Sequence, residues 1–541
     1  MAGTAALPDV ATLIARRLHA AGCRHAFGIP GGEVLAMMQA LDDAGIAFTL
    51  CKHENSAAFM AEGSFHATGA PGILLATIGP GLANGVNAVA NGWQDQVPLI
   101  VLSGAVDAVE AASYTHQVFD HQALMRPITK ASLSMVDGAA DLLIDRAVAI
   151  ALADPPGPVH VDVPIGLAGH DQREPGRVAV PMEPPMAPAG GAALDQARAM
   201  LANAVRPLMI AGMGALHHDA GIEIRALVER FRMPLLTTYK AKGILPEDHE
   251  LALGGHGLSP RSDREVMPLL EAADLILLAG YDPIEMRIGW RDPWDPAKAI
   301  EFTHVPNRHG MHGAALSFVG DVGRGIAAIG AGLEPGGETW PERAPAQARA
   351  RLHGLFADRP AWGPHAAFAA ARRAVPRDTV VTADSGAHRI LLSQMWTCYA
   401  ERTLLQSTAL CTMGCALPLA IGHKLAAPDR PVLAVMGDAG LEMVLGELAT
   451  LRDLELSLVV LVMVDASLAL IELKQRGASR RNVGVDFGAT DLAAVAAAMG
   501  GHGCRATDVA TLERELAAGF RRDGFTLVAC EIGARAYDDA F

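Results

Sequence analysis

The stretch Val432-Leu433-Ala434-Val435-Met436-Gly437-Asp438-Ala439-Gly440 joins a run of apolar residues to a glycine-containing turn with an aspartate at its centre. A second apolar run, residues 458–464, is followed directly by Asp465. Near-continuous apolar runs are typical of strands in parallel sheets, and the carboxyl ends of such strands lie at one edge. The sequence therefore predicts an α/β layer with two carboxylates at the same edge.

Two interpretations of this turn are open. Backbone N–H groups at the start of a helix bind phosphate, and two carboxylates beside them can hold Mg²⁺ against the phosphate oxygens. Alternatively, Asp438 and Asp465 are ordinary helix caps, because an acidic residue after a strand often caps the next helix. The turn by itself favours helix capping. The choice between capping and a phosphate and Mg²⁺ site therefore depends on the rest of the sequence.

Length and composition indicate a compact protein of several domains. The chain has 541 residues, which corresponds to about three domains of roughly 100 to 200 residues each. Apolar residues make up 51% and charged residues 19%, so long disordered segments are not expected.

The charge balance argues against nucleic acid or an anionic membrane as a partner. The chain has 44 basic and 59 acidic residues, a formal net charge of −15, and no extended block of Lys or Arg. A small molecule is therefore the expected partner.

The sequence also predicts the compartment. Seven cysteines lie without CxxC or zinc-type spacing, which indicates a reducing compartment and no disulfide framework. Residues 1–8 lack the basic and long apolar segments of a secretory signal. No apolar run approaches the roughly 18 residues of a membrane-spanning helix. We therefore expect a cytoplasmic protein.

Strand-like and helical segments alternate along the chain, which is typical of α/β domains with parallel sheets. Residues 10–21 have the apolar spacing of an amphipathic helix. The expected strands are residues 47–51, 72–77, 98–102, 159–163, 207–211, 275–279, 299–302, 379–382, 432–435, 458–464 and 526–532.

Two segments rich in Pro and Gly, residues 180–191 and 332–346, are predicted to be linkers. They divide the chain into three α/β units, residues 1–178, 192–330 and 360–541, each of the usual size of a domain.

Glu54 follows the strand expected at residues 47–51 and precedes a helix expected at residues 56–65. It would lie at a strand's carboxyl edge, like the two aspartates, although the helix dipole alone also favours an acidic residue there. Glycine-containing turns at residues 28–32 and 79–84 would let a flat ligand approach the backbone, or serve only as tight connections.

Two further segments carry polar or small residues. Thr115-His116-Gln117 would present hydrogen-bond donors to a substrate, or would simply be solvated. Thr412-Met413-Gly414 precedes a helix rich in small residues, where Met413 is either core filler or part of a site.

Taken in order, these segments resemble the thiamine diphosphate-dependent decarboxylase and carboligase superfamily over nearly the whole chain. Within it, the sequence is most similar to the FAD-independent, catabolic acetolactate synthases. The matching patterns are GIPG at residues 28–31, HE at 53–54, THQ and PITK within 115–130, GYDPIE at 280–285, VTADSGAH at 381–388, TMGCALPLAIG at 412–422, GDAG at 437–440, ELAT at 447–450 and VDFG at 485–488.

The resemblance implies three doubly wound parallel-sheet domains: an N-terminal pyrimidine-binding domain, a central domain and a C-terminal diphosphate-binding domain. It also implies thiamine diphosphate and Mg²⁺ as cofactors. FAD is not expected, because residues 280–285 differ from the segment rich in Arg, Phe and Asp that FAD-binding synthases carry there.

The resemblance also implies roles for individual residues. Glu54 would bond the pyrimidine ring and relay a proton, and Met413 would hold the cofactor bent. Asp438, Asp465 and the main-chain oxygen of Ser467 would bind the cation. The implied cofactor-binding residues are Pro30, Glu54, Asn84, Ala387, His388, Thr412, Met413, Gly437, Asp438, Ala439, Gly440 and Asp465.

The implied reaction decarboxylates pyruvate and joins the remaining two-carbon unit to a second 2-oxo acid, giving 2-acetolactate. Glu54 would be the catalytic activator, and Gln117 and His116 would contact the substrate, with Gly32 beside them. Glu54 and Asp438 come from different domains, which in these relatives belong to two chains. We therefore expect a homodimer or homotetramer with the cofactor at the interface.

Several positions depart from the pattern. Glu33 stands where the catabolic synthases have a substrate-side lysine, and a carboxylate there would repel a substrate carboxylate by about 1 to 4 kcal/mol. Ile78 replaces a serine, Ala439 replaces a glycine, and residues 468–474 lack the usual aromatic residue and paired glutamines. Asp465, in contrast, is shared with the catabolic synthases.

Three hypotheses follow. The first is an acetolactate synthase-like carboligase. The second is a thiamine-dependent decarboxylase or lyase acting on a different 2-oxo acid or a neutral carbonyl donor, which Glu33 and Ile78 favour. The third is a non-catalytic homologue, which the retention of Glu54, Met413 and Asp438 disfavours.

Overall fold

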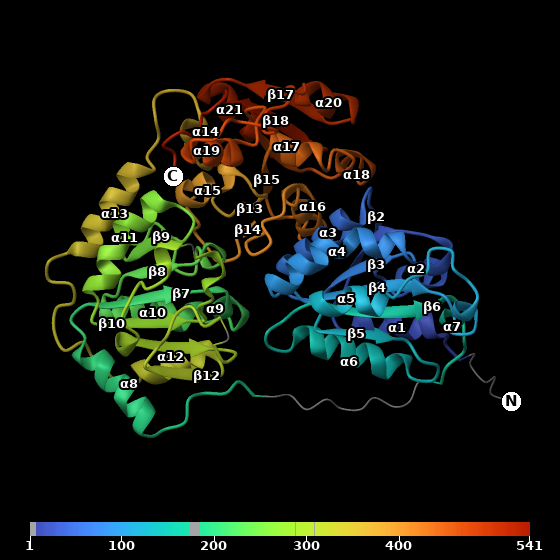
Figure 1. Cartoon of the computed structure of the whole chain (residues 1–541), viewed down its shortest axis with the longest axis horizontal. Coiled ribbons are helices and arrows are strands. Elements are labelled where there is room, and N and C mark those ends of the chain that lie inside the picture. The colour runs from blue at the N-terminus through green and yellow to red at the C-terminus, as the bar shows by residue number, and fades with distance from the viewer. Residues whose placement is uncertain (1–6, 174–183, 287, 308) are drawn as a thin grey trace.

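A computed structural model describes residues 7–173, 184–286, 288–307 and 309–541. These residues form three lobes, each built around one six-stranded sheet, and every strand pair is parallel. In Figure 1 the N-terminal lobe is blue to cyan, the central lobe green to yellow, and the C-terminal lobe orange to red. The predicted α/β class with three doubly wound parallel sheets is confirmed.

The N-terminal sheet has the strand order β2-β1-β3-β4-β6-β5. Its strands are β1 (His25–Ile29), β2 (Ala47–Leu50), β3 (Gly72–Ala76), β4 (Leu99–Ala105), β5 (Ala131–Ser134) and β6 (Val159–Pro164). Its helices are α1 (Val10–Ala20), α2 (Leu35–Asp43), α3 (Glu54–Thr68), α4 (Pro80–Gln94), α5 (His121–Met125), α6 (Ala140–Leu152) and α7 (Ile165–Ala168).

The central sheet has the order β12-β11-β10-β7-β8-β9. Its strands are β7 (Pro207–Ala211), β8 (Leu235–Thr237), β9 (Ala252–Gly255), β10 (Leu275–Ala279), β11 (Ala299–Thr303) and β12 (Leu316–Val319). Its helices are α8 (Ala192–Asn203), α9 (Met213–His217), α10 (Gly221–Phe231), α11 (Pro260–Ala272) and α12 (Val322–Gly330).

The C-terminal sheet has the order β14-β13-β15-β16-β18-β17. Its strands are β13 (Val380–Ala383), β14 (Leu404–Gln406), β15 (Val432–Gly437), β16 (Val459–Val464), β17 (His502–Ala506) and β18 (Thr526–Glu531). The accompanying helices are α13 (Ala344–Leu355), α14 (Pro364–Ala374), α15 (Ala387–Met395), α16 (Ala416–Ala426), α17 (Asp438–Glu442), α18 (Glu447–Asp453), α19 (Ala469–Gly477), α20 (Leu492–Ala498) and α21 (Val509–Gly519).

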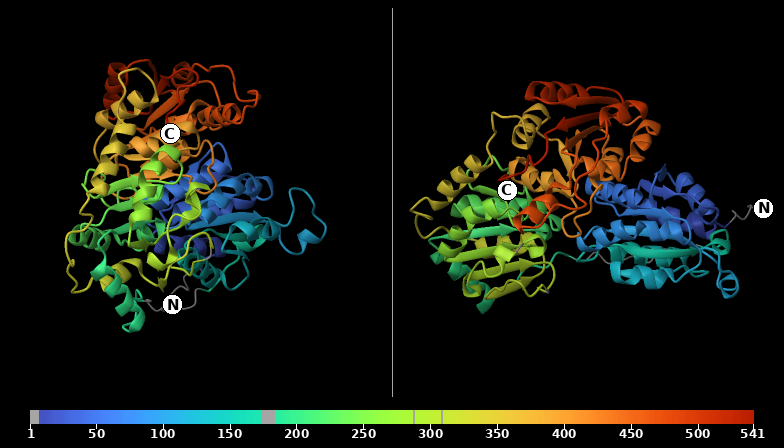
Figure 2. Two further views of the ribbon diagram at one scale, coloured as in Figure 1. Left: turned by 60° about the vertical axis from the view of Figure 1, so that its left-hand side comes forward. Right: turned by 45° about the horizontal axis from the view of Figure 1, so that its top comes forward.

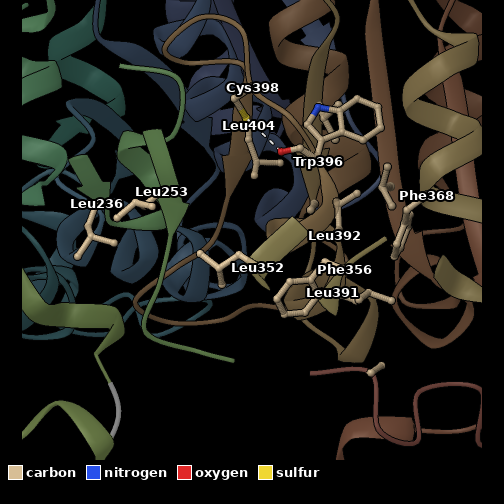
Figure 3. Packing of buried hydrophobic residues seen from close by; sticks show 14 of the residues in the cluster. Leu236, Leu253, Leu352, Phe356, Phe368, Leu391, Leu392, Trp396, Cys398 and Leu404 are labelled. Atoms are coloured by element: carbon tan, nitrogen blue, oxygen red, sulfur yellow. Dashed lines mark hydrogen bonds between the residues drawn. The ribbon is translucent and has the colours of Figure 1, made fainter. Parts of the chain in front are cut away.

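One hydrophobic cluster joins the central and C-terminal lobes. Leu236 and Leu253 on the central sheet belong to the same cluster as Leu352 on α13 and Phe368 on α14. Figure 3 shows these side chains together with those of α15 and the following segment, including Trp396. The apolar area buried here holds the two lobes together, because burial of such side chains is the main favourable term in folding.

The N-terminal and C-terminal lobes meet where α3 packs against α16. The two helices approach closely at glycines: a Cβ on Gly63 would lie 2.2 Å from the Leu419 carbonyl oxygen, and one on Gly422 would lie 1.9 Å from the Met60 carbonyl oxygen. A second apolar cluster runs across this contact, from the N-terminal core to residues of α16. Glycine at both positions is therefore what allows the crossing.

Among the strands that the sequence did not predict, β5 and β17 have weak apolar patterns, whereas β8 and β14 are buried but only three residues long. β5 is half-buried or exposed along its length, and β17 has two exposed residues among its five, so neither has the run of apolar residues expected of a central strand. Both pair on one side only, β5 with β6 and β17 with β18, and thus end their sheets.

The predicted domain boundaries remain predictions. Residues 1–6 and 174–183, which include the end of the first predicted unit and the start of the first predicted linker, lie outside the described residues. Residues 184–191 contain no helix or strand before α8, and the second predicted linker leads into α13. Among the described residues, no helix has the length and apolar character needed to cross a membrane.

Candidate cofactor site

A cavity of about 180 Å³ lies at the carboxyl edge of the C-terminal sheet. Strands β13, β15 and β16 are neighbours in this sheet, so the residues that follow them meet at one place. The lining residues are Ser385, Gly386, Ala387, His388, Cys411, Met413, Gly437, Asp438, Ala439, Gly440, Met463, Asp465, Ser467, Leu468, Ala469, Leu470, Ile471 and Tyr537. Nine predicted site residues of the C-terminal lobe are among them: Ala387, His388, Met413, Gly437, Asp438, Ala439, Gly440, Asp465 and Ser467.

Asp438 is a buried carboxylate held by backbone donors. Its Oδ2 accepts the N–H groups of Asp465 (3.1 Å) and Ala466 (2.7 Å), and its Oδ1 accepts that of Ala439 (2.8 Å). Residue 466 has a positive φ of 54°, which turns the chain so that consecutive N–H groups face Asp438. The side chain is thus fixed in the cavity wall.

The two aspartates repel one another. Burial raises the pKa of Asp465 to about 7, and the negative charge of Asp438 adds to the rise. Burial also raises the pKa of Asp438, against the hydrogen bonds that lower it. Two neighbouring carboxylates that resist joint ionisation make a donor set that fits a divalent cation, because a cation favours the charged form of both.

His388 is held by a residue that the sequence did not single out. Asp384 is fully buried, and its Oδ1 lies 2.8 Å from His388 Nε2 while its Oδ2 accepts the Gly414 N–H (2.8 Å). A Cβ on Gly440 would lie only 2.0 Å from the same carboxylate. Asp384 therefore joins three predicted segments around the cavity.

Tyr537 enters the cavity from the C-terminal end of the chain. It is 3% exposed, and its hydroxyl has no hydrogen-bond partner among the described residues. Burial and the charges of Asp465 and Asp438 raise the pKa of the hydroxyl well above its usual value. An unpaired buried donor is costly unless a ligand accepts from it, and a phosphate oxygen would do so.

Met413 lines the cavity, but its neighbour Thr412 does not. The Thr412 hydroxyl lies 3.2 Å from Asn87 Nδ2 of α4, and its N–H donates to Ser407 Oγ (2.9 Å). Thr412 thus connects the cavity wall to the N-terminal lobe of the same chain.

The predicted residues of the N-terminal lobe form a second, separate group. Glu54 is the first residue of α3, follows the end of β2 and is 5% exposed. Asn84 donates through Nδ2 to Glu54 Oε2 (2.9 Å), so these two predicted residues are together. Within the described chain, Glu54 does not line the cavity that contains Asp438.

Glu33 and Ile78 lie at the same edge of the N-terminal sheet, after β1 and β3. Glu33 is half-buried, and its Oε2 accepts the Thr77 hydroxyl (2.8 Å), whereas Ile78 is 3% exposed. Pro30 and Gly32 belong to the turn between β1 and α2 that carries Glu33. The loops that the sequence predicted to face a ligand therefore do share one edge.

His116 and Gln117 lie in an exposed segment between β4 and α5, which extends away from the rest of the chain in the left view of Figure 2. Gln117 has a positive φ of 59°, and a Cβ on Gly79 would lie 2.2 Å from its carbonyl oxygen. The backbone at Gln117 therefore packs on the turn that follows Ile78.

A buried network supports that turn. The Gly79 N–H donates to His121 Nε2 (3.1 Å), and His121 Nδ1 lies 2.7 Å from Asp162 Oδ1. Burial opposes ionisation of Asp162, but hydrogen bonds from His121, His160 and Ser103 hold its pKa below the usual range. The ring of His121 is thus oriented so that its free nitrogen faces the turn.

Sequence reasoning missed four residues that shape these sites: Asp384, Tyr537, His121 and Asp162. Asp384 lies inside the VTADSGAH pattern, so this motif could have identified it as a site residue. No local pattern marks Tyr537, because only the course of the last residues brings it to the cavity. His121 and Asp162 are 41 residues apart, and only the fold joins them.

Three family models match the chain. Residues 8–124 match the N-terminal TPP binding domain of thiamine pyrophosphate enzymes, residues 194–329 match the central domain, and residues 384–530 match the C-terminal TPP binding domain. The probable 2-ketoarginine decarboxylase AruI of Pseudomonas aeruginosa is 31% identical over 510 residues, covering 93% of this chain and 90% of the relative.

The chain belongs to the thiamine pyrophosphate enzymes.

Acetolactate synthases are also similar to this thiamine pyrophosphate enzyme. The acetolactate synthase of Bacillus subtilis is 29% identical over 94% of this chain and 90% of the relative. The large subunit of acetolactate synthase isozyme 1 of Escherichia coli is 29% identical over 86% of this chain and 83% of the relative. The predicted superfamily and its similarity to acetolactate synthase are confirmed.

Proposed function

We propose that this thiamine pyrophosphate enzyme is an acetolactate synthase-like carboligase, which decarboxylates pyruvate and joins the two-carbon product to a second 2-oxo acid. The observation that carries the proposal is the pair of buried Asp438 and half-buried Asp465 beside the Gly437–Gly440 turn, a cation and phosphate donor set in the domain that matches a TPP binding domain. The similarity to acetolactate synthases supports the choice of reaction.

In this proposal the C-terminal cavity holds the diphosphate and a Mg²⁺ ion. The carboxylates of Asp438 and Asp465 and the main-chain oxygen of Ser467 would bind the cation, all of them hard oxygen ligands. Backbone N–H groups of the Gly437–Gly440 turn, His388 and the unpaired Tyr537 hydroxyl would donate to phosphate oxygens.

Glu54 would hold and move the proton that activates the cofactor. Bound thiamine diphosphate supplies a nucleophilic carbon and a place for the electrons released when CO₂ leaves. Asn84 donates to one oxygen of Glu54, so the other oxygen is directed to the ligand. The burial of Glu54 strengthens that hydrogen bond, because competing water is excluded.

We further propose that two copies of the chain complete each site. The support is that Asp438 lines a cavity made only of C-terminal residues, whereas Glu54 lies at another edge of the same described chain. A homodimer or homotetramer that brings Glu54 of one copy to the cavity of another would assemble both halves.

A second candidate is a thiamine-dependent decarboxylase that acts on another 2-oxo acid. The Glu33 carboxylate favours it, since it would repel the carboxylate of a small donor such as pyruvate. The similarity to a probable 2-ketoarginine decarboxylase gives it further support. For either candidate we propose that FAD is not used, so the purified protein should be colourless, and a yellow preparation would contradict this.

The test is incubation of the purified enzyme with pyruvate, thiamine diphosphate and Mg²⁺ while CO₂ and acetolactate are measured. The carboligase proposal expects both products, and Glu54→Gln is expected to lower kcat by about 10²-fold or more, the contribution typical of a positioned proton donor. The matched control is Asp42→Asn, an exposed residue on α2 outside the site. Release of CO₂ from another 2-oxo acid but not from pyruvate would favour the second candidate, and full activity of Glu54→Gln would contradict the role of Glu54.

A further inference from the structure

The strand-end loops of the N-terminal lobe are acidic and lack fixed positive charge. Between Arg24 and Arg126 the sequence contains one Lys or Arg, which is Lys52. The Nζ of Lys52 lies 3.1 Å from Asp453 Oδ2 in the C-terminal lobe, so that charge is already balanced. The acidic residues in the segments that follow β1, β2 and β4 are Glu33, Glu54, Asp107, Glu110 and Asp120.

Glu33 contacts the turn after β3. Its Oε2 accepts the Thr77 hydroxyl at 2.8 Å, which fixes the carboxylate over the end of the strand. No Lys, Arg or His in the described ranges forms a salt bridge with it, although its side chain is half-buried. A half-buried carboxylate without a cation leaves one oxygen available to a positively charged ligand.

Thr77 places Glu33 beside Glu54. A Cβ on Gly81 would lie 2.8 Å from Thr77 Cγ2 and 3.4 Å from Glu54 Oε1, so the side chains of Thr77 and Glu54 both lie next to Gly81. Thr77 thus bonds Glu33 through its hydroxyl and lies on the same side of Gly81 as Glu54, so both carboxylates are at one edge of the sheet.

We propose that the donor substrate is a 2-oxo acid whose side chain carries a positive charge, a guanidinium or a protonated amine, and that Glu33 binds this charge. The inference rests on the second candidate under the proposed function, a thiamine-dependent decarboxylase for a 2-oxo acid other than pyruvate, and it takes Glu54 as the residue at the reacting cofactor. A carboxylate pairs with a guanidinium through two parallel hydrogen bonds, and an ammonium pairs with it as a point charge. In the described segments that follow β1, β2, β3 and β4, Lys52 is the one Lys or Arg, and its pairing with Asp453 leaves no free cation there for an anionic side chain.

The experiment compares three 2-oxo acids of similar length with thiamine diphosphate and Mg²⁺ present. The probes are 5-guanidino-2-oxopentanoate, the neutral 2-oxohexanoate and the anionic 2-oxoadipate, and the readout is kcat/KM for CO₂ release. We expect the guanidino acid to exceed the neutral acid by about tenfold or more, which corresponds to ~1.4 kcal/mol. The anionic acid should be the poorest of the three.

The variant Glu33→Gln keeps the size and the acceptor oxygen for Thr77 but removes the charge. It should reduce the preference for the guanidino acid over the neutral acid to near unity. Glu33→Lys should reverse the order and favour 2-oxoadipate. The control Asp42→Asn, an exposed acid on the same lobe, should leave the ratio unchanged.

Direct binding of the guanidino acid, measured by calorimetry on the cofactor-loaded enzyme, separates this inference from the proposed function. Tighter binding to wild type than to Glu33→Gln supports the inference even where turnover is slow. Turnover of the neutral acid without any preference for the cationic acid overturns the inference and leaves the proposed function standing. If no 2-oxo acid releases CO₂ and the guanidino acid does not bind, both are overturned.

Discussion

At the scale of the residue, Asp438 and Asp465 lie where negative charge is most costly. Both are in the wall of a cavity, both have a pKa raised by burial, and each charge opposes the other at the ends of adjacent strands. Such an arrangement is unfavourable by itself and becomes favourable when a cation is bound. The pair is therefore better explained by a ligand than by helix capping.

Replacing one of these carboxylates should weaken the binding of cation and cofactor together. We expect Asp438→Asn to lower the apparent affinity for Mg²⁺ in the presence of thiamine diphosphate by about tenfold or more, or ~1.4 kcal/mol. The measurement is the rise in Tm as Mg²⁺ is titrated. An exposed acid elsewhere in the same lobe, replaced by Asp523→Asn, is the control. An unchanged titration in Asp438→Asn would show that the cation binds elsewhere.

At the scale of the element, the crossing of α3 and α16 depends on glycine at positions 63 and 422. A Cβ at Gly63 would also lie 2.8 Å from the His423 backbone nitrogen, so it would meet backbone rather than a flexible side chain. The backbones of α3 and α16 cannot move apart here without separating the N-terminal lobe from the C-terminal lobe.

The variant Gly63→Ala should therefore destabilise the protein although alanine is the better helix former. We expect a loss of about 1 to 3 kcal/mol in the free energy of unfolding, as for other overpacked sites. The measurement is the urea midpoint. Gly354→Ala is the matched control, because Gly354 lies in α13 with no atom near its would-be Cβ, and it should be neutral or stabilising by ~0.5 to 1 kcal/mol.

Glu62, also on helix α3, makes a pH-dependent contribution to the free energy of unfolding. It is 1% exposed, accepts from Asn91 Nδ2 (2.9 Å), and has a pKa raised from 4.5 to about 7, chiefly by burial. A group whose pKa is higher in the folded state stabilises that state most below its unfolded pKa, and this contribution is lost as the pH rises through its folded pKa.

We therefore expect the stability of the wild type to fall between about pH 4.5 and pH 7 by an amount on the order of 2 to 3 kcal/mol from this group. Glu62→Gln should remove that part of the pH dependence and be at least as stable as wild type at pH 8. Urea unfolding at several pH values checks this. Parallel pH profiles for the two proteins would mean that Glu62 does not titrate in that interval.

At the scale of the whole molecule, the two halves of the proposed site lie on different lobes. The described lining of the C-terminal cavity contains no residue of the N-terminal lobe, while Glu54 is held at the edge of its own sheet by Asn84. A site assembled from two copies of the chain would explain both observations.

Mixing two inactive variants tests this arrangement. If each site takes Glu54 from one chain and Asp438 from another, a mixed dimer of Glu54→Gln and Asp438→Asn has one site with both changes and one with neither. Random mixing should then restore about a quarter of the wild-type activity, since half of the dimers are mixed and each has one intact site in two. Activity that stays as low as in either variant alone would place both residues in one chain's site.

The sequence predicted the parts of this molecule that have local patterns. The apolar runs before Asp438 and Asp465 predicted two strands, and the structure places them side by side as β15 and β16. Glu54 was expected at a strand's carboxyl edge, and it is the first residue of α3 after β2. Strands such as β5 were missed because half-exposed residues leave no apolar run, and strands such as β8 because three residues are too few to show one.

By itself, the sequence determined the α/β class, the three parallel sheets and the turns at their carboxyl edges, because apolar runs and glycine turns act over a few residues. Only the tertiary structure decided that Tyr537 enters the cavity, that Asp384 joins His388 to Gly414, and that Glu54 does not line the cavity that contains Asp438. These relations join residues distant in sequence, and they depend on how helices and sheets pack, which no local pattern records.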